Sequence, residues 1–177
     1  MMVGHSRGFT LIELLVVLVL LGSLIGLAVI GSGLADPGRE LREEAERLAG
    51  LIAVLADEAV LDNREYGLYL TRDAYQVLRY DDVADVWQPL GAQSRRLPGW
   101  AELSLELEGD PASLPSLAKG ASGAKIPPPQ VLMLSSGELT PFRLRLREQR
   151  QNGQRLLLAS DGFGLPRVQN EPAAGAF

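Results

Sequence analysis

Cysteine is absent from this sequence of 177 residues, and histidine occurs once, as His5. Without cysteine the chain cannot form disulfides, use a thiol in catalysis or build a cysteine-ligated metal site, although the absence does not identify a compartment. The one histidine lies near the amino terminus, where it does not provide a basis for a histidine-based catalytic triad or a zinc site. A phosphate-binding glycine motif is missing too. We therefore expect no catalytic residue, no cofactor and no metal.

One long stretch of the chain has no charged residue. The formal net charge is −5, with both signs interspersed, which argues against a nucleic-acid partner. Between Leu14 and Ile30 no residue is charged. A helix from Phe9 to Ile30 would be about 33 Å long, which is enough to cross a hydrocarbon core of about 30 Å. The sequence therefore predicts a membrane-spanning helix over residues 9–30.

A single carboxylate, that of Glu13, lies near the start of this apolar stretch. An acid inside a bilayer costs about 2.5–3.5 kcal/mol at the centre and less near an edge. Intramembrane acids are rare and usually paired, so Glu13 is a candidate functional residue. The alternative is that Glu13 lies at the headgroup level of an ordinary signal anchor.

The segment before the apolar stretch, residues 1–8, is short and polar and ends in Gly8. A secretory signal peptide would have its small-residue cleavage site after the apolar stretch, where residues 31–37 fit such a site only weakly. Instead, Gly8-Phe9-Thr10-Leu11-Ile12-Glu13-Leu14 resembles the class III leader of type IV pilins and type II secretion pseudopilins. The resemblance implies that a prepilin peptidase cuts after Gly8 and methylates the new amino terminus at Phe9. It also implies that the apolar helix stays as a membrane anchor and later forms the core of a filament.

The position of Glu13 is consistent with this resemblance. After cleavage, Phe9 would carry a new amine four residues before Glu13, near the same helix face. In a helical assembly the amine of one subunit could meet the carboxylate of its neighbour inside an apolar core, where their attraction is less screened. We therefore predict processing at Gly8 and Phe9 and a role for Glu13 in assembly.

A bend or linker over residues 31–38, with Pro37 and several glycines, is expected to separate the anchor from a second helix. That helix is predicted from Arg39 to about Asp62, because small and large apolar residues recur in steps of four and three. The stripe consists of Leu41, Ala45, Leu48, Ile52, Leu55 and Ala59. We expect it to pack on the protein's own sheet, with a dimeric coiled coil as the alternative.

After Asn63 the apolar period changes to two, which predicts strands. The clearest alternation is Leu103 to Glu108, and a hairpin is expected where residues 71–74 join the first two strands. A helix followed by antiparallel strands is an α+β domain, and no strand–helix alternation supports a nucleotide-binding parallel sheet. The expected strands are 66–70, 75–80, 86–90, 103–108, 131–134, 142–147 and 155–160.

Other candidate sites are weak. Asp81, Asp82 and Asp85 lack the spacing and closing glutamate of a calcium loop, so a solvated strand end is the better interpretation. Residues 135–138, Ser-Ser-Gly-Glu, lack a histidine base and are typical of a turn. Trp87 and Trp100 are expected to pack in the domain, although one of them could contribute to an interface.

Two segments carry no regular pattern. Residues 109–130, with five prolines, are expected to be a mobile excursion, or else a loop ordered by another subunit. The tail, residues 170–177, is also expected to be flexible.

Segments across the domain resemble the GspH/FimT family of type IV pilin-like proteins. They are Glu65-Tyr66-Gly67-Leu68, Tyr75-Gln76-Val77-Leu78-Arg79-Tyr80, Trp87-Gln88-Pro89-Leu90 and Leu134-Ser135-Ser136-Gly137-Glu138-Leu139-Thr140-Pro141-Phe142. This family includes the GspH minor pseudopilins of type II secretion and FimT/FimU-type minor pilins. The resemblance implies a periplasmic head with two packed sheets behind the helix.

Together, these observations predict a non-enzymatic pseudopilus subunit that acts in protein export near the tip of the filament. Its expected location is the bacterial inner membrane, with a single pass and a periplasmic head, and later the periplasmic pseudopilus. Expected partners are the other minor pseudopilins, the major pseudopilin, the prepilin peptidase and the membrane. The alternatives are a FimT/FimU-type minor type IV pilin and a signal-anchored periplasmic enzyme. The predicted segments are a leader (1–8), an anchor (9–30), a linker (31–38), a head (39–169) and a tail (170–177).

Overall fold

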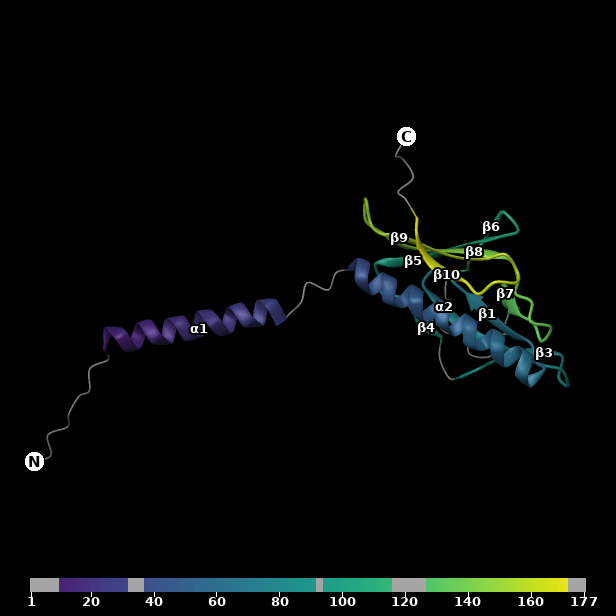
Figure 1. Cartoon of the computed structure of the whole chain (residues 1–177), viewed down its shortest axis with the longest axis horizontal. Coiled ribbons are helices and arrows are strands. Elements are labelled where there is room, and N and C mark those ends of the chain that lie inside the picture. The colour runs from purple at the N-terminus through teal and green to yellow at the C-terminus, as the bar shows by residue number, and fades with distance from the viewer. Residues whose placement is uncertain (1–9, 32–36, 92–93, 116–126, 172–177) are drawn as a thin grey trace, which may run out of the picture. The chain divides into compact units, whose positions relative to one another are not determined.

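The chain forms two compact units, Met1–Asp36 and Pro37–Phe177 (Figure 1). The computed structural model describes residues 10–31, 37–91, 94–115 and 127–171, and no side chain within 25–31. The described part of the first unit is one helix with the residue before it, and this helix is α1 (Leu11–Gly31). In the described part of the chain, no helix has both the length and the apolar character that crossing a membrane requires. The predicted anchor, 9–30, includes positions outside the described side chains and stays a prediction.

The second unit, the head, begins with helix α2 (Pro37–Asp62), which starts two residues before the expected position. Proline suits the first position of a helix because that amide has no partner inside the helix. The predicted apolar stripe is confirmed, since all six of its residues are buried. Glu44 is buried as well, at 7% exposure, because it lies three residues after Leu41 and four before Leu48, at the edge of the stripe.

Behind α2, the described strands form two antiparallel sheets. The first has the order β3-β2-β1-β7, with β4 also paired to β2, and the second has the order β10-β9-β8-β5-β6. The strands of the first sheet are β1 (Tyr66–Leu70), β2 (Ala74–Asp81), β3 (Val86–Pro89), β4 (Arg95–Arg96) and β7 (Val131–Met133). Those of the second are β5 (Ala101–Leu107), β6 (Asp110–Ala112), β8 (Phe142–Glu148), β9 (Arg155–Ser160) and β10 (Arg167–Asn170).

Alternation within the strands decides which residues enter the core. In β8, Phe142, Leu144 and Leu146 are buried, whereas Arg143 and Arg147, which alternate with them, are exposed. Because side chains of successive strand residues point to opposite faces, one face of the sheet joins the core and the other meets solvent. The inner faces of both sheets pack with the stripe of α2 in one continuous core. The predicted α+β, pilin-like architecture is therefore confirmed.

The prediction of an irregular segment from Gly109 onward was wrong at its start. Glu108 and Gly109 both have positive φ, 52° and 94°, and they form a two-residue turn that brings β6 back onto β5. Turns of this kind match the twist of antiparallel strands. Pro111 is tolerated because β6 is an edge strand. Residues 116–126 lie outside the described residues.

The predicted tail needs a similar correction at its start. Asn170 is the last residue of β10, and the Glu171 amide donates to the carbonyl of Arg155 at 3.0 Å. These contacts extend the head by two residues. The remaining tail positions, 172–177, lie outside the described residues.

A polar cluster centred on the buried Glu44 joins the first half of α2 to the first sheet. Arg95 donates two hydrogen bonds to the Glu44 carboxylate, at 2.7 and 2.9 Å, and the Tyr75 hydroxyl donates a third at 3.0 Å. Arg47 donates a longer hydrogen bond to the same carboxylate, at 3.3 Å. Burial, followed by the neighbouring Glu44 charge, raises the pKa of Tyr75, so its hydroxyl stays protonated and remains a donor. This cluster explains why Glu44 is buried.

Replacing Glu44 with alanine should lower the free energy of unfolding by about 2–3 kcal/mol, because Tyr75 would lose its charged acceptor in a buried position. Glu43→Ala is the matched control. It removes an exposed pair with Arg39 and should change stability by less than about 1 kcal/mol. Urea unfolding of the purified variants measures both, and equal effects would contradict the role assigned to the cluster.

Gly67, the second residue of β1, lets Pro129 approach the strand backbone closely. A Cβ at this position would lie 2.3 Å from Cγ of Pro129 and 3.3 Å from Cζ3 of Trp87. Gly50, in α2, has nothing within 4 Å of the same point. The two glycines therefore have opposite tolerances for a larger side chain.

Gly67→Ala should destabilise the head by about 1–3 kcal/mol, because Pro129 must move. Gly50→Ala should instead stabilise it by about 0.5–1 kcal/mol, because alanine favours a helix interior. Thermal unfolding of the two variants distinguishes these effects. A stable Gly67→Ala protein would show that Pro129 does not pack on β1 as described.

Candidate assembly surfaces

The first turn of α1 is organised by Thr10. Its hydroxyl oxygen accepts the Glu13 amide at 3.3 Å, and its carbonyl accepts the Leu14 amide at 3.2 Å. A threonine followed three residues later by glutamate is a common helix start, which sequence reasoning missed here. The Glu13 carboxylate also lies near the positive end of the helix dipole, which favours a negative charge by about 0.3–1 kcal/mol. Glu13 therefore has a local role in starting the helix as well as its predicted role in assembly.

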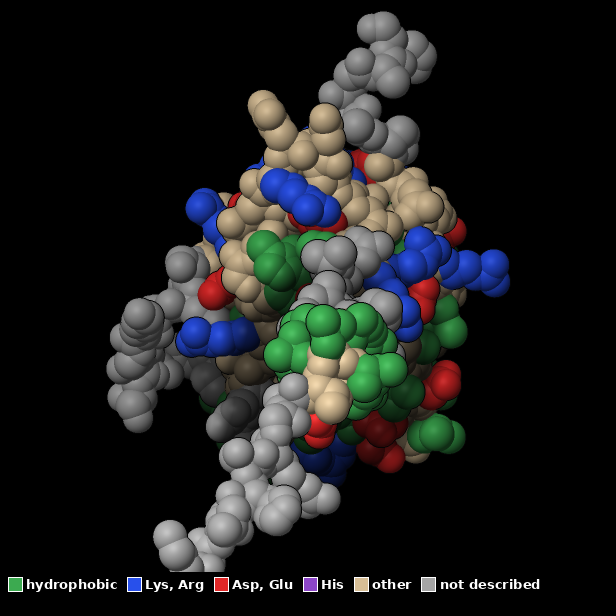
Figure 2. All heavy atoms as spheres, turned by 90° about the vertical axis from the view of Figure 1, so that its left-hand side faces the viewer, with side chains coloured by type: hydrophobic (Ala, Val, Ile, Leu, Met, Phe, Trp, Pro, Cys, Tyr) green, Lys and Arg blue, Asp and Glu red, His purple; other side chains and the backbone are tan. Residues whose placement is uncertain are grey.

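The described side chains of α1, which end at Leu24, expose apolar groups in all directions. Large apolar residues between Leu11 and Leu24 have exposed fractions from 42% to 82%. Figure 2, which views α1 along its axis, shows hydrophobic side chains all around it. The Ser23 hydroxyl donates to the Val19 carbonyl at 2.8 Å, so this polar group is satisfied inside the helix. From Leu11 to Leu24, Glu13 is the only charged residue.

The two predicted processing residues, Gly8 and Phe9, lie outside the described residues. The structure therefore brings Thr10 and Glu13 together at the start of α1, while the predictions for Gly8 and Phe9 rest on the sequence.

The acidic turn after β2 has a structural explanation. One oxygen of Asp81 accepts the amides of Val83 and Ala84 at 3.1 and 3.0 Å, and the other accepts Nε2 of Gln88 at 2.7 Å. These hydrogen bonds, that from Ala84 above all, lower the pKa of Asp81. Across the described residues, no group of three or more acidic, histidine or cysteine side chains could hold a metal ion. The interpretation of this segment as a solvated strand end is supported.

Three other predictions concern single segments of the head. Residues 135–138 form a turn, closed by a hydrogen bond from the Gly137 amide to the Leu134 carbonyl at 2.9 Å. Trp87 is half-buried against Tyr80, with ring centroids 5.3 Å apart. Trp100 is half-buried beside the core. All three predictions agree with the structure.

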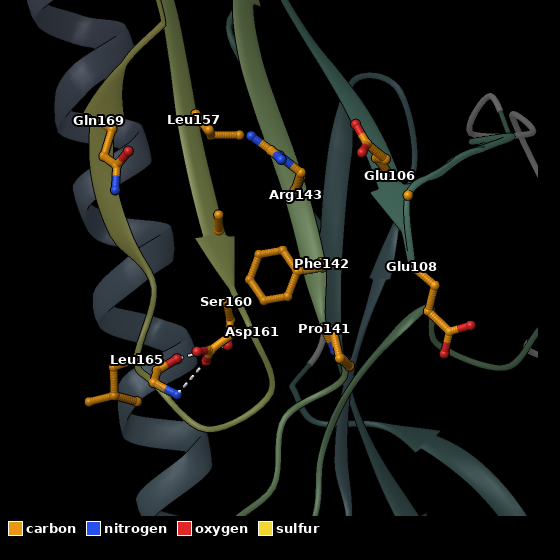
Figure 3. Close-up of a pocket in the computed structure, with 13 residues that line it drawn as sticks. Glu106, Glu108, Pro141, Phe142, Arg143, Leu157, Ser160, Asp161, Leu165 and Gln169 are labelled. Atoms are coloured by element: carbon orange, nitrogen blue, oxygen red, sulfur yellow. Dashed lines mark hydrogen bonds between the residues drawn. The ribbon is translucent and has the colours of Figure 1, made fainter.

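The second sheet has a solvent-facing side that sequence reasoning did not single out. We call it the outer face. It carries the outward residues of four strands: Glu102, Ser104 and Glu106 on β5; Arg143, Arg145 and Arg147 on β8; Arg155, Leu157 and Ala159 on β9; and Arg167 and Gln169 on β10. A cavity of about 560 Å³ lies on this face, lined by Glu106, Arg143, Leu157, Asp161, Leu165 and Gln169 among others (Figure 3).

The loop after β9 borders this cavity and is held by its own side chains. Oδ1 of Asp161 accepts the amides of Phe163 and Gly164 at 3.2 and 3.1 Å, which lowers the pKa of Asp161. The Ser160 hydroxyl donates to the Gly164 carbonyl at 2.7 Å. The loop leaves Phe163 81% exposed and Leu165 51% exposed. An ordered loop with an exposed aromatic side chain is typical of a protein-binding surface.

Comparisons with known proteins agree with the architecture described above. A sequence profile described as "Type II transport protein GspH" matches residues 44–162, and one described as "Prokaryotic N-terminal methylation motif" matches residues 4–29. The "Type II secretion system protein H" of Pseudomonas aeruginosa is 61% identical over 166 residues, covering 93% of this chain and 96% of that protein. The protein of the same name from Aeromonas hydrophila is 32% identical and covers 93% of each chain.

Solved structures show the same fold at low identity. The minor pseudopilin EpsH of the Vibrio cholerae type 2 secretion system matches with a TM-score of 0.56 and 22% identity, over 78% of this chain and 99% of that one. The solution structure of Escherichia coli GspH matches with a TM-score of 0.57 and 19% identity, over 81% of this chain and 97% of that one. The sequence matches carry the assignment and the structures support its fold. The chain belongs to the GspH family of minor pseudopilins of type II secretion.

Proposed function

We propose that this minor pseudopilin is held in the bacterial inner membrane by residues 9–30 before assembly, with its head in the periplasm. The exposed apolar side chains of α1 carry this proposal, because exposed apolar surface on this scale is unfavourable in water and requires a cover. Lipid provides that cover before assembly, and the corresponding helices of other subunits provide it afterwards. As a pseudopilin, the protein assembles with other pseudopilins, and we place it near the filament tip.

We further propose that Glu13 meets the methylated amine of Phe9 on a neighbouring subunit. The support is the exposed position of Glu13 in the first turn, surrounded by apolar side chains that would be covered in a filament. A carboxylate in such surroundings is stable only with a partner. An amine placed there by cleavage after Gly8 has the required charge.

The role is structural in this proposal, and export across the outer membrane depends on the filament as a whole. The family members that match are named as type II secretion proteins, which favours a secretion pseudopilus over a type IV pilus. Those relatives are structural pseudopilins, so we assign no reaction to this chain.

Processing gives the first test of this proposal. Intact-mass analysis of protein extracted from membranes should show a chain that begins at methylated Phe9. Gly8→Leu should leave the precursor uncut, because the small residue at the cleavage point is lost. An uncut wild-type chain in cells with active prepilin peptidase would contradict the proposed maturation.

Assembly gives the second test. Glu13→Leu should leave the membrane level unchanged, because an apolar residue replaces an acid. It should reduce cross-linking to other pseudopilins, because an amine buried without its partner costs about 3–5 kcal/mol. Glu13→Gln keeps a polar side chain without the charge and should fail in the same way.

Thr10→Ala separates the pairing role of Glu13 from its role in the helix start. It removes the bond to the Glu13 amide while leaving the carboxylate in place. It should therefore assemble much better than Glu13→Gln. If Thr10→Ala impairs assembly and Glu13→Gln does not, Glu13 acts through helix capping and the pairing proposal is wrong.

A further inference from the structure

Glu148, the last residue of β8, is buried, and neither of its carboxylate oxygens accepts a hydrogen bond from the described residues. Nε of Arg150 lies 2.5 Å from one of these oxygens, which compensates the charge without the alignment of a hydrogen bond. The other arginine–carboxylate pairs of the same sheet, such as Arg147 with Glu102, are hydrogen-bonded. Because a buried charged acceptor without donors is unfavourable, Glu148 needs a physical explanation.

The turn between β8 and β9 covers this carboxylate. The Gly153 amide donates to the Arg150 carbonyl at 3.1 Å, and a Cβ on Gly153 would lie 2.5 Å from Cβ of Glu148. The side chain of Arg150 is 63% exposed, and its two terminal nitrogens have no partner among the described residues. Exposed side chains change rotamer rapidly. The turn therefore holds Glu148 in place, whereas Arg150 is able to rotate away from it.

Glu148 and Arg150 line a cavity of about 420 Å³ at the end of the head where α2 begins, together with Pro37 and Trp100. The Gln149 amide donates to the Trp100 carbonyl at 2.8 Å, which joins the turn to the segment before β5. Small-molecule sites have volumes of about 300–1,000 Å³, so this cavity is large enough for a ligand. It offers a carboxylate, a guanidinium and an indole ring on one surface.

This combination selects a ligand that carries both charges. A cation alone would be repelled by Arg150 as it approached Glu148, and an anion alone would be repelled by Glu148. A zwitterion with an amine and a phosphate avoids both conflicts, because the amine pairs with the carboxylate and the phosphate with the guanidinium. A primary ammonium supplies the three N–H donors that Glu148 lacks, which a quaternary ammonium cannot do. Trp100 adds a π face for the same cation.

The position of the cavity in the chain indicates the source of such a ligand. Only residues 32–36 separate the end of α1 at Gly31 from Pro37. A chain of this length spans at most about 22 Å even when fully extended. If residues 9–30 lie in the membrane, Pro37 and the cavity that it lines are held within reach of the lipid headgroups.

We propose that this cavity binds the phosphoethanolamine headgroup of a membrane phospholipid, with the ammonium on Glu148 and Trp100 and the phosphate on Arg150. The inference rests on the proposed function, because it assumes that residues 9–30 span the inner membrane. On binding, Arg150 rotates away from Glu148, and each of the two charges exchanges its partner for a group of the lipid. The site holds this end of the head on the bilayer before assembly.

Native mass spectrometry of the full-length chain tests the site by its headgroup selectivity. The protein is released from mixed micelles that contain equal amounts of phosphatidylethanolamine and phosphatidylcholine with the same acyl chains. The apolar surface of α1 should retain both lipids, whereas the cavity should enrich phosphatidylethanolamine by about tenfold. Monomethylated and dimethylated headgroups should lose this enrichment in steps, which tests the site without any change in the protein.

Two substitutions locate the selectivity in the cavity. Glu148→Gln and Arg150→Gln should each reduce the enrichment to about twofold or less, because each removes one of the charges that the headgroup needs. The matched control is Arg39→Gln, which removes an exposed arginine near the start of α2 that does not line the cavity, and it should leave the enrichment unchanged. Circular dichroism and thermal unfolding show whether each variant is folded.

The inference is overturned if the wild-type chain shows no enrichment, or if the enrichment survives both substitutions in folded protein. A stronger preference for phosphatidylglycerol would show an ordinary basic surface in place of the site. Competition by soluble phosphoethanolamine at the concentration of the lipid would show a site for a free small molecule and not for a membrane.

Carbonate extraction of membranes distinguishes these failures from failure of the proposed function. If the chain resists extraction but lacks headgroup selectivity, the anchor stands and the cavity site is wrong. Release of the wild-type chain by carbonate would contradict the anchor itself.

Discussion

Exposure of the apolar side chains of α1 is the constraint on which the rest of the protein depends. Between Leu11 and Leu24 the helix is apolar on every side, apart from Glu13 and small residues. It therefore has no polar face that could be turned toward water. The described head completes its own core with α2 and two sheets. We propose that lipid surrounds α1 before assembly and that other subunits surround it afterwards.

The buried Glu44 carboxylate serves packing in the head, because its hydrogen bonds with Tyr75 and Arg95 hold β2 and β4 on α2. On the outer face, Arg143 lies opposite Glu106 in the register, yet Glu106 contacts Arg145 instead. In our account α1 supplies the contacts common to every subunit.

Periodicity made much of the fold predictable, and tertiary contacts explain what was missed. The stripe from Leu41 to Ala59 and the alternation in β5 and β8 repeat with the period of their elements, so sequence alone located them. β4 has only two residues, both arginines, and it pairs with β2 where Arg95 contacts Glu44, which no local pattern reveals. Among the described residues Arg143 forms no ion pair, because Glu106, which lies opposite it, contacts Arg145 instead. The sequence pattern does not show which of the two arginines Glu106 contacts. The leader was recognisable because its chemistry is local in sequence.

Site-specific labelling tests most directly whether the apolar surface of α1 is always covered. The natural chain has no cysteine, so single substitutions can report accessibility without background. Val17→Cys lies on α1, and Val83→Cys lies on a fully exposed loop of the head. In cells with a permeabilised outer membrane, a membrane-impermeant maleimide should label Val83→Cys rapidly and Val17→Cys only after solubilisation, both with and without the other pseudopilins. Equal labelling of the two positions in intact membranes would contradict the account.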